Sequence, residues 1–356
     1  MKITVEKNGY EEIIKNYLLK EIPQAIHPTD DISEIILSEL LATREIRQGA
    51  KPSILHQANI IKDIKAAINN STPIPILIGS GPKKTLSGES IDLAEFYVLK
   101  TLNCLNNNIK KYYPLGISVS IRLEDYTGYV LEPKNEEASI SKYIDDFKKL
   151  SYILGYDFIN IYTEGDFVDM NTFMSMVNNY QPTFLHYLLA TMEEEDVNKY
   201  KFFPKALEGW KGIIPDIMRT YLIERYKRSY PNLTEYQYIE MMSRYFAATY
   251  VRHLTKSTGN VFDTNPIQLS FIGAVPGISE DLHSNRIYYR TVPMSNTKVH
   301  LPFWRAKGYF KITENNDVRI SLSNWYDLPQ DLQENYINLE RSNTTLSLKA
   351  DYLLIN

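Results

Sequence analysis

The chain has 356 residues, of which 44% are hydrophobic, and its formal net charge is −4. Its 27 tyrosines and 13 phenylalanines exclude a disordered chain, and the slightly negative charge provides no overall basic field to attract nucleic acid. The single cysteine, Cys104, excludes an internal disulfide and a cysteine-based zinc site. No stretch reaches the roughly 18 apolar residues of a membrane span, so we expect a cytoplasmic protein without a membrane partner.

The first third of the chain alternates predicted helices with two predicted strands. Apolar residues at helical spacing indicate the helices, and short apolar or alternating runs indicate the strands. In chain order these are helices over residues 11–19, 31–47 and 53–69, a strand over 74–78, a helix over 91–112 and a strand over 117–122. Asp31 and Glu34 have the spacing of a capping box, and Ser90 is the expected N-cap of the fourth helix.

The middle of the chain is mostly helical. A helix over residues 139–154 leads into a short apolar strand over 157–162, and residues 166–231 indicate a helical insertion that includes a helix over 215–228. Thr234 and Gln237 then form a capping box at the start of a long helix that extends to residue 256.

From residue 266 the periodicity becomes that of strands. The predicted strands cover residues 267–272, 286–292, 309–312, 318–323 and 344–354. The whole order predicts an α/β protein with a Rossmann-like, mostly parallel sheet flanked by helices. We expect an N-terminal helical segment (1–70), the α/β core with its insertion (71–265), and a β-rich C-terminal part (266–356) packed on the same core, either as an extension of the sheet or as an adjoining layer.

The segment at residues 73–95 has the pattern of an anion-binding connection. An apolar strand is followed by Gly79, Ser80, Gly81 and Pro82, which are expected to end it, and then by Lys83 and Lys84. α/β proteins hold anions in such a loop, between the carboxyl end of a strand and the N-terminus of a helix. The alternative is an ordinary connection with a solvated lysine pair, since the glycine spacing fits neither a Walker loop nor a dinucleotide fingerprint.

Two groups of basic residues lie outside this segment. Arg44 and Arg47 come at the end of a predicted helix, where they either bind a substrate or compensate the helix dipole. Arg122 lies on the polar face of its strand and is followed by Glu124 and Asp125. It is either a clamp for a phosphate or carboxylate or one half of a buried ion pair with one of these two acids.

The sequence around residues 300–305 brings His300, Trp304 and Arg305 close together. This mixture suits a pocket for an aromatic or amino-acid substrate, and a packing cluster at the end of a strand is the alternative. Elsewhere the standard catalytic motifs are absent, and the six histidines show no metal-ligand spacing. We therefore expect no metal and no cofactor, although carboxylates keep a metal site open.

The order of these features resembles the pyoverdine/dityrosine biosynthesis family, the isocyanide synthases. The resemblance extends over about residues 35–312. Its motifs match residues 78–84, 88, 91–95, 112–116, 117–122, 124–126, 140–143, 241–254, 267–271 and 301–305. Two histidines of the family have no counterpart at residues 272–274 and 304–305.

The resemblance implies an enzyme that converts an amino-acid amine to an isocyanide, with ribulose 5-phosphate as the carbon donor and without a metal or nucleotide. Lys83 and Lys84 then anchor the sugar phosphate, and Asp92 and Glu95 are candidates for proton transfer. Residues expected to bind substrate are Arg47, Ser80, Arg122, Asp125, His300, Trp304 and Arg305. The alternatives are another small-molecule transferase or lyase on the same fold and a non-catalytic binding protein. The sequence predicts no oligomeric state.

Overall fold

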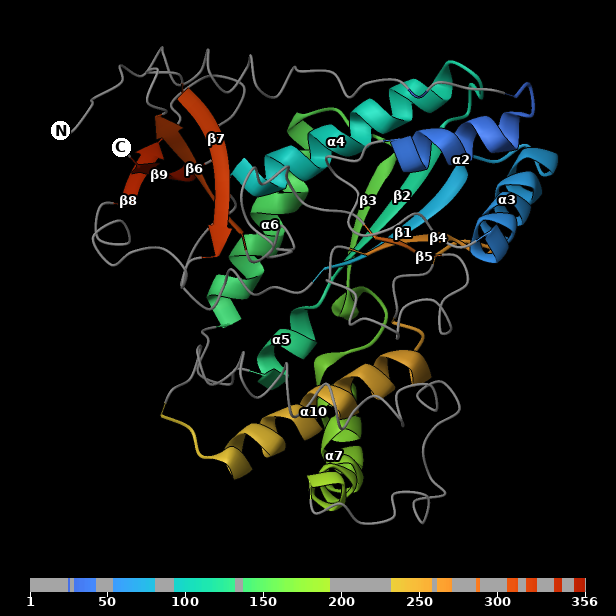
Figure 1. Cartoon of the computed structure of the whole chain (residues 1–356). Coiled ribbons are helices and arrows are strands. Elements are labelled where there is room, and N and C mark those ends of the chain that lie inside the picture. The colour runs from blue at the N-terminus through green and yellow to red at the C-terminus, as the bar shows by residue number, and fades with distance from the viewer. Residues whose placement is uncertain are drawn as a thin grey trace.

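The computed structural model describes residues 25, 29–42, 54–80, 93–131, 137–192, 232–257, 261–270, 286–288, 306–312, 318–324, 336–340 and 349–355. These residues form a five-stranded parallel sheet flanked by helices and a helical unit beyond the carboxyl ends of two of its strands. They also form a second, four-stranded sheet (Figure 1). The predicted α/β class, with a helical insertion and a β-rich C-terminal part, is confirmed.

The main sheet has the strand order β3-β2-β1-β4-β5, and every neighbouring pair is parallel. Its strands are β1 (Ile74–Ser80), β2 (Ile117–Leu123), β3 (Ile159–Thr163), β4 (Ile267–Ser270) and β5 (Arg286–Tyr288). Ile76, Val119 and Ile121 are inaccessible to solvent. Parallel strands covered on both faces need buried apolar residues, and the apolar run of β1 and the alternation in β2 supply them, which is why both strands were predictable from the sequence.

A proline in the central strand β1 is accommodated by the register of the sheet. Ile74 N donates to Gly116 O on the β2 side at 2.9 Å, so the next residue, Pro75, directs its nitrogen to the opposite side. Pairing with β4 begins only at Ile76. The missing N–H of Pro75 therefore interrupts no hydrogen bond of the ladder.

Four helices form the larger hydrophobic core together with the main sheet. They are α2 (Ile32–Ala42), α3 (Ile54–Asn69), α4 (Leu93–Lys110) and α6 (Glu137–Ile153). Asp31 caps α2, since its Oδ1 accepts from Ser33 N at 2.8 Å and from Glu34 N at 3.4 Å. Cys104 is buried in α4, as expected of a small core residue.

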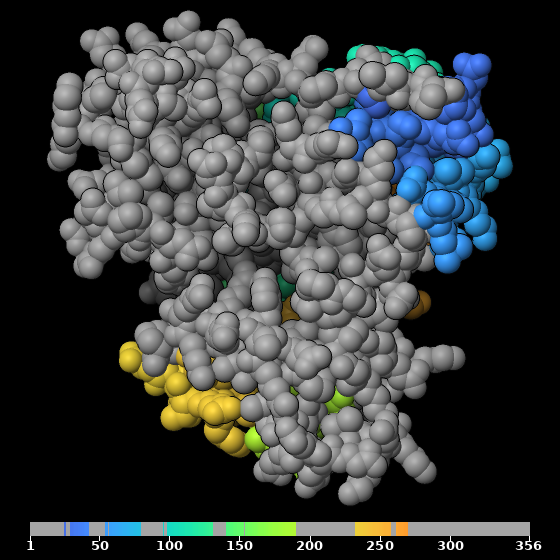
Figure 2. All heavy atoms as spheres, in the orientation of Figure 1, coloured from blue at the N-terminus to red at the C-terminus, as the bar shows by residue number. Residues whose placement is uncertain are grey.

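A second hydrophobic core lies in a helical unit beyond the carboxyl ends of β2 and β3 (Figure 1). The unit consists of α5 (Asp125–Leu131), α7 (Met170–Met192) and α10 (Glu235–Leu254). The predicted capping box of α10 is present: Gln237 N donates to Thr234 Oγ1 at 3.3 Å, and Thr234 N donates to Gln237 Oε1 at 2.8 Å. Atoms of α10 reach the surface at one end of the molecule, and those of α2 and α3 at the other (Figure 2).

The second sheet has the strand order β7-β6-β9-β8. Its strands are β6 (Ala306–Ile312), β7 (Val318–Asn324), β8 (Tyr336–Glu340) and β9 (Lys349–Ile355). β6 pairs parallel with β9 and antiparallel with β7, and it contacts α4. β4 and β5 thus belong to the main sheet, while β6–β9 form a sheet of their own.

The structure corrects two details of the sequence analysis. The first strand continues through Gly79 and Ser80, because these residues pair with Arg122 and Leu123 of β2. β8 was not predicted, since its five residues are a short alternating run between polar segments. The predicted helices over residues 11–19 and 215–228, and the continuation of α2 over 43–47, lie outside the described residues. No helix in the described part is long and apolar enough to cross a membrane.

Candidate functional site

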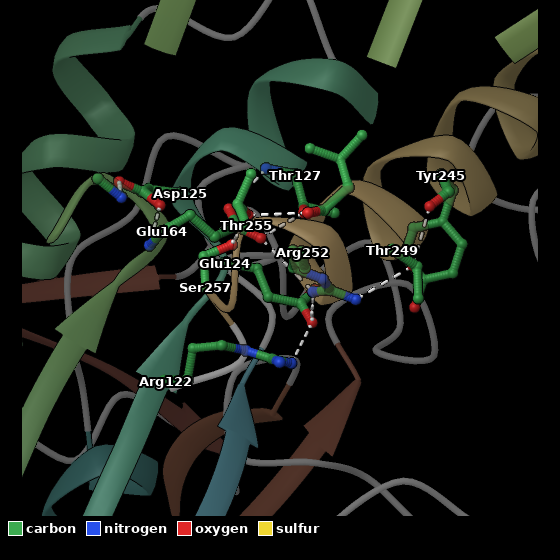
Figure 3. A network of polar contacts seen from close by, with 12 residues as sticks. Arg122, Glu124, Asp125, Thr127, Glu164, Tyr245, Thr249, Arg252, Thr255 and Ser257 are labelled. Atoms are coloured by element: carbon green, nitrogen blue, oxygen red, sulfur yellow. Dashed lines mark hydrogen bonds and ion pairs between the residues drawn. The ribbon is translucent and has the colours of Figure 1, made fainter. Parts of the chain in front are cut away.

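A network of charged and polar side chains occupies the carboxyl edge of the main sheet, where β2 and β3 end against the helical unit (Figure 3). In parallel α/β sheets, ligands bind at the carboxyl ends of the strands, at the point where the strand order reverses. Here β2 and β3 lie on one side of β1, and β4 and β5 lie on the other. The order therefore reverses at β1, which is the neighbour of β2 and the strand that precedes Lys83 and Lys84 in the sequence.

Glu124 links the sheet to the helical unit. Its Oε1 accepts from Arg122 Nη2 at 2.9 Å and also from Nη1 of Arg252, in the last turn of α10. Arg252 Nη2 donates to Thr249 Oγ1 at 3.1 Å. The side chains of Arg122, Glu124 and Arg252 are 15%, 14% and 6% exposed, so both ion pairs are shielded from bulk water.

Asp125 joins the ends of β2 and β3. Its Oδ1 accepts from Glu164 N at 2.7 Å, and its Oδ2 accepts from Gly165 N at 3.3 Å, so it satisfies two backbone donors of the 3-10 turn after β3. A Cβ atom at Gly165 would lie 3.1 Å from Asp125 Oδ2 and 2.9 Å from the hydroxyl of Tyr126. Glycine is the residue that allows this close approach.

The side chain of Glu164 contacts α5 in return. Its carboxylate accepts from Thr127 N at 2.8 Å and from Thr127 Oγ1 at 2.5 Å, and its Oε1 lies 3.5 Å from Nη1 of Arg252. The side chain is inaccessible to solvent. Burial raises the pKa of Glu164 to about 8, against the lowering effect of Arg252 and with a further rise from Asp125. Burial also raises the pKa of Asp125.

The two arginines of the network differ in their electrostatic environment. Burial lowers the pKa of Arg122, and the positive charge of Arg252 lowers it further. Burial also acts to lower the pKa of Arg252, but the charges of Glu124 and Glu164 outweigh it, so this pKa is raised. The carboxylates therefore stabilise the charge of Arg252 more fully than the charge of Arg122.

Another buried carboxylate lies in the first turn of α4, the helix that comes after Lys83 and Lys84 in the sequence. Glu95 is inaccessible to solvent, and its Oε1 accepts from the hydroxyl of Tyr143 on α6 at 2.9 Å. A carboxylate and a phenol at hydrogen-bond distance form a pair that can pass a proton to a third group.

The structure thus locates some of the predicted site residues and not others. Arg122 has the ion pair with Glu124 that the sequence left open as one of two roles, and Asp125 lies in the same network. Ser80 ends β1. The remaining predicted residues lie outside the described residues: Arg47, Lys83, Lys84, Asp92, His300, Trp304 and Arg305. Their roles stay predictions.

Sequence reasoning did not find Glu164, Thr127 or Arg252. In retrospect, two of them had a sequence signal: Glu164 directly follows a short apolar strand, and Arg252 follows Val251 on a helix with many apolar residues. As for metals, the described residues contain no group of three or more His, Cys, Asp or Glu side chains that could hold an ion.

Comparison with known proteins gives one informative likeness. No family model and no curated protein matches the sequence. Among solved structures, tryptophanyl-tRNA synthetase from Giardia lamblia is 16% identical, with a TM-score of 0.29 over 76% of this chain and 60% of that chain, a score too low to indicate a common fold. The PvcA protein from Pseudomonas aeruginosa is 17% identical, with a TM-score of 0.57 over 91% of this chain and 100% of that chain. The chain therefore shares its fold with PvcA.

Proposed function

We propose that the protein is a biosynthetic enzyme of secondary metabolism that converts the amine of an amino acid to an isocyanide, with ribulose 5-phosphate as the carbon donor. The observation that carries this proposal is the fold shared with PvcA, which extends over the whole of that chain. It supports, at the level of the fold, the resemblance to the isocyanide synthases that the order of sequence motifs indicates.

The carboxyl edge of the main sheet has the charges that such substrates require. A sugar phosphate and an amino acid both carry anionic groups, which bind well to arginine and lysine. Arg122 lies at the end of β2, and Lys83 and Lys84 follow the end of β1 in the sequence. We assign the sugar phosphate to the two lysines.

The first chemical step needs groups that move protons. The amine nitrogen attacks the ketone carbon of the sugar, and the resulting carbinolamine loses one water to form an imine, so the departing hydroxyl must receive a proton. Glu95, with its hydrogen bond from Tyr143, is our candidate for this role, and Asp92 is the alternative. The sugar carbon that becomes bonded to nitrogen is the one assigned to the isocyanide, so later steps must break both of its bonds to neighbouring sugar carbons.

The proposal is tested by incubating the protein with single amino acids and ribulose 5-phosphate, followed by mass spectrometry. When the sugar carries ¹³C at its ketone carbon, the isocyanide gains one mass unit. Conversion of the sugar phosphate into a different amine-dependent product indicates another transferase or lyase on this fold. Sugar-phosphate binding without any product indicates a binding protein, and the two unmatched family histidines at residues 272–274 and 304–305 favour that outcome over another enzyme.

The lysine assignment has its own test. Changing both Lys83 and Lys84 to alanine is expected to abolish binding of ribulose 5-phosphate in calorimetry while the melting temperature changes little, because loop lysines contribute little to stability. Unchanged binding in the double variant would refute the lysines as the anchor.

A further inference from the structure

The position of Arg122 is set by the register of the sheet and by a glycine. Arg122 of β2 pairs with Gly79 of β1, and a Cβ atom at Gly79 would lie 3.1 Å from Arg122 Nη2. The guanidinium group therefore lies against the end of β1, in space that a larger residue at position 79 would occupy. This is the strand at which the order of the sheet reverses, where α/β proteins bind their ligands.

The network holds this guanidinium group from one side. Glu124 Oε1 accepts from Arg122 Nη2, and the same oxygen accepts from Nη1 of Arg252. Arg252 is fixed in turn by Thr249 and by its 3.5 Å contact with Glu164. The contact between Arg252 and Glu124, 128 positions apart in the sequence, thus holds the carboxylate that accepts from Arg122.

A purely structural role does not explain why two arginines share one carboxylate oxygen. Arg252 alone supplies a cation to both Glu124 and Glu164, and its charge is stabilised by them. Arg122 adds a second positive charge beside the first, and the two guanidinium groups repel each other. Two guanidinium groups on one carboxylate oxygen, one of them against the end of β1, suit the binding of a further anion.

We propose that Arg122 binds an anionic oxygen group of a substrate, a carboxylate or a phosphate, at the end of β1, and that Arg252 positions Arg122 through Glu124. The inference rests on the proposed function for the nature of the substrates. Anion binding itself is measured without turnover, so the two can fail separately.

Anion binding at Arg122 has a consequence for Glu164. An added negative charge raises the pKa of a nearby acid, so binding at about pH 8 is accompanied by proton uptake. The charged and titratable groups that face Glu164 are Arg252 from α10, Asp125 and Tyr126 from α5, and Glu124 from the junction before α5. Glu164 is inaccessible to solvent and has a pKa of about 8, close to the pH of the experiment, so the proton is assigned to Glu164.

The test is calorimetric titration with inorganic phosphate, ribulose 5-phosphate and L-tyrosine. Ribulose and L-tyrosinamide, which lack the phosphate and the carboxylate, show which group Arg122 holds. We expect Arg122→Gln to weaken binding of the relevant probe about 10- to 100-fold, the value of a charge-assisted hydrogen bond. Arg122→Lys, which keeps the charge and loses the planar fork, is expected to restore part of the affinity.

Arg252→Gln tests the positioning role. We expect a smaller loss of affinity than for Arg122→Gln, with partial rescue in Arg252→Lys. Arg244→Gln is the matched control, since Arg244 lies on the same helix, outside the network, in a half-exposed pair with Glu240. The Arg244→Gln protein is expected to bind the anion as tightly as the unmodified protein does. Titrations in buffers of different ionisation enthalpy measure the number of protons taken up when the anion binds. The Glu164→Gln protein is expected to bind the anion without proton uptake.

Two results overturn the inference: a folded Arg122→Gln protein that binds all three probes as the unmodified protein does, or an unmodified protein that binds none of them. Wild-type affinity in Arg252→Gln overturns the positioning role. Isocyanide production that is unaffected by Arg122→Gln leaves the proposed function in place and removes this inference. If anion binding depends on Arg122 but no isocyanide forms, this inference stands and the proposed function fails.

Discussion

The larger hydrophobic core and the network at the carboxyl edge of the sheet are both buried, yet they are stabilised by different interactions. The core consists of apolar side chains such as Ile76, Ile121 and Phe147, for which volume and shape matter. The network consists of Arg122, Arg252 and their carboxylate partners, for which charge matters. A change of pH or of a single charge should therefore affect the stability of the network and leave that of the core unchanged.

The largest effect is expected from truncation in the core. Phe147→Ala removes a fully buried ring of α6 that contacts Tyr143, and we expect it to lower the free energy of unfolding by about 3–5 kcal/mol. Because no charge changes, denaturant titrations at about pH 6 and about pH 9 should give the same loss. A loss that differs between the two pH values would show that the core and the network are not independent.

Arg252→Met is expected to lower the free energy of unfolding by about 3 kcal/mol, because Glu124 and Glu164 lose a buried cation. Removal of this charge raises the pKa of Glu164 further, so the loss should be larger at about pH 9, where the unmodified protein has an ionised Glu164, than at about pH 6. The same denaturant titrations measure it, with Arg244→Met as the control on α10. An equal loss at both pH values would contradict the electrostatic origin.

The pH dependence of stability is the third prediction. Glu164 has a pKa of about 8 in the folded protein, raised from 4.5, so between these values the folded protein keeps a proton that the unfolded chain has released. The free energy of unfolding should therefore fall as the pH rises through this window, by an amount on the order of a few kcal/mol. Glu164→Gln should flatten the dependence. Stability that does not fall in this window would show that Arg252 keeps Glu164 ionised.

The smallest effect is expected at the exposed start of α10. Thr234→Ala removes the side chain that accepts from Gln237 N, and we expect a loss of about 1 kcal/mol in unfolding free energy. The loss should not depend on pH, since no titratable group takes part. A Thr234→Ser variant, which keeps the hydroxyl, should retain nearly all of the stability, and a loss as large as that of alanine would argue against the cap.

The sequence predicted those parts of the fold whose signals are local. The apolar run of β1, the alternation in β2 and the capping box at Thr234 each depend on neighbouring residues, and all three are present in the structure. The extension of β1 through Gly79 and Ser80 was missed because it depends on pairing with β2.

The candidate site was predictable in part for the same reason. Arg122, Glu124 and Asp125 are close in sequence, so an ion pair among them could be anticipated. Glu164 meets Thr127 across 37 positions and Arg252 meets Glu124 across 128, and no local pattern reports such contacts. The raised pKa of Glu164 is a property of its burial among these partners.

The most direct test of the account is a crystal structure of the protein with ribulose 5-phosphate and an amino acid bound. The account predicts both ligands at the carboxyl ends of β1 and β2, with an anionic oxygen within hydrogen-bond distance of the guanidinium group of Arg122. Ligands bound at the second sheet, or at the amino ends of the main-sheet strands, would contradict it.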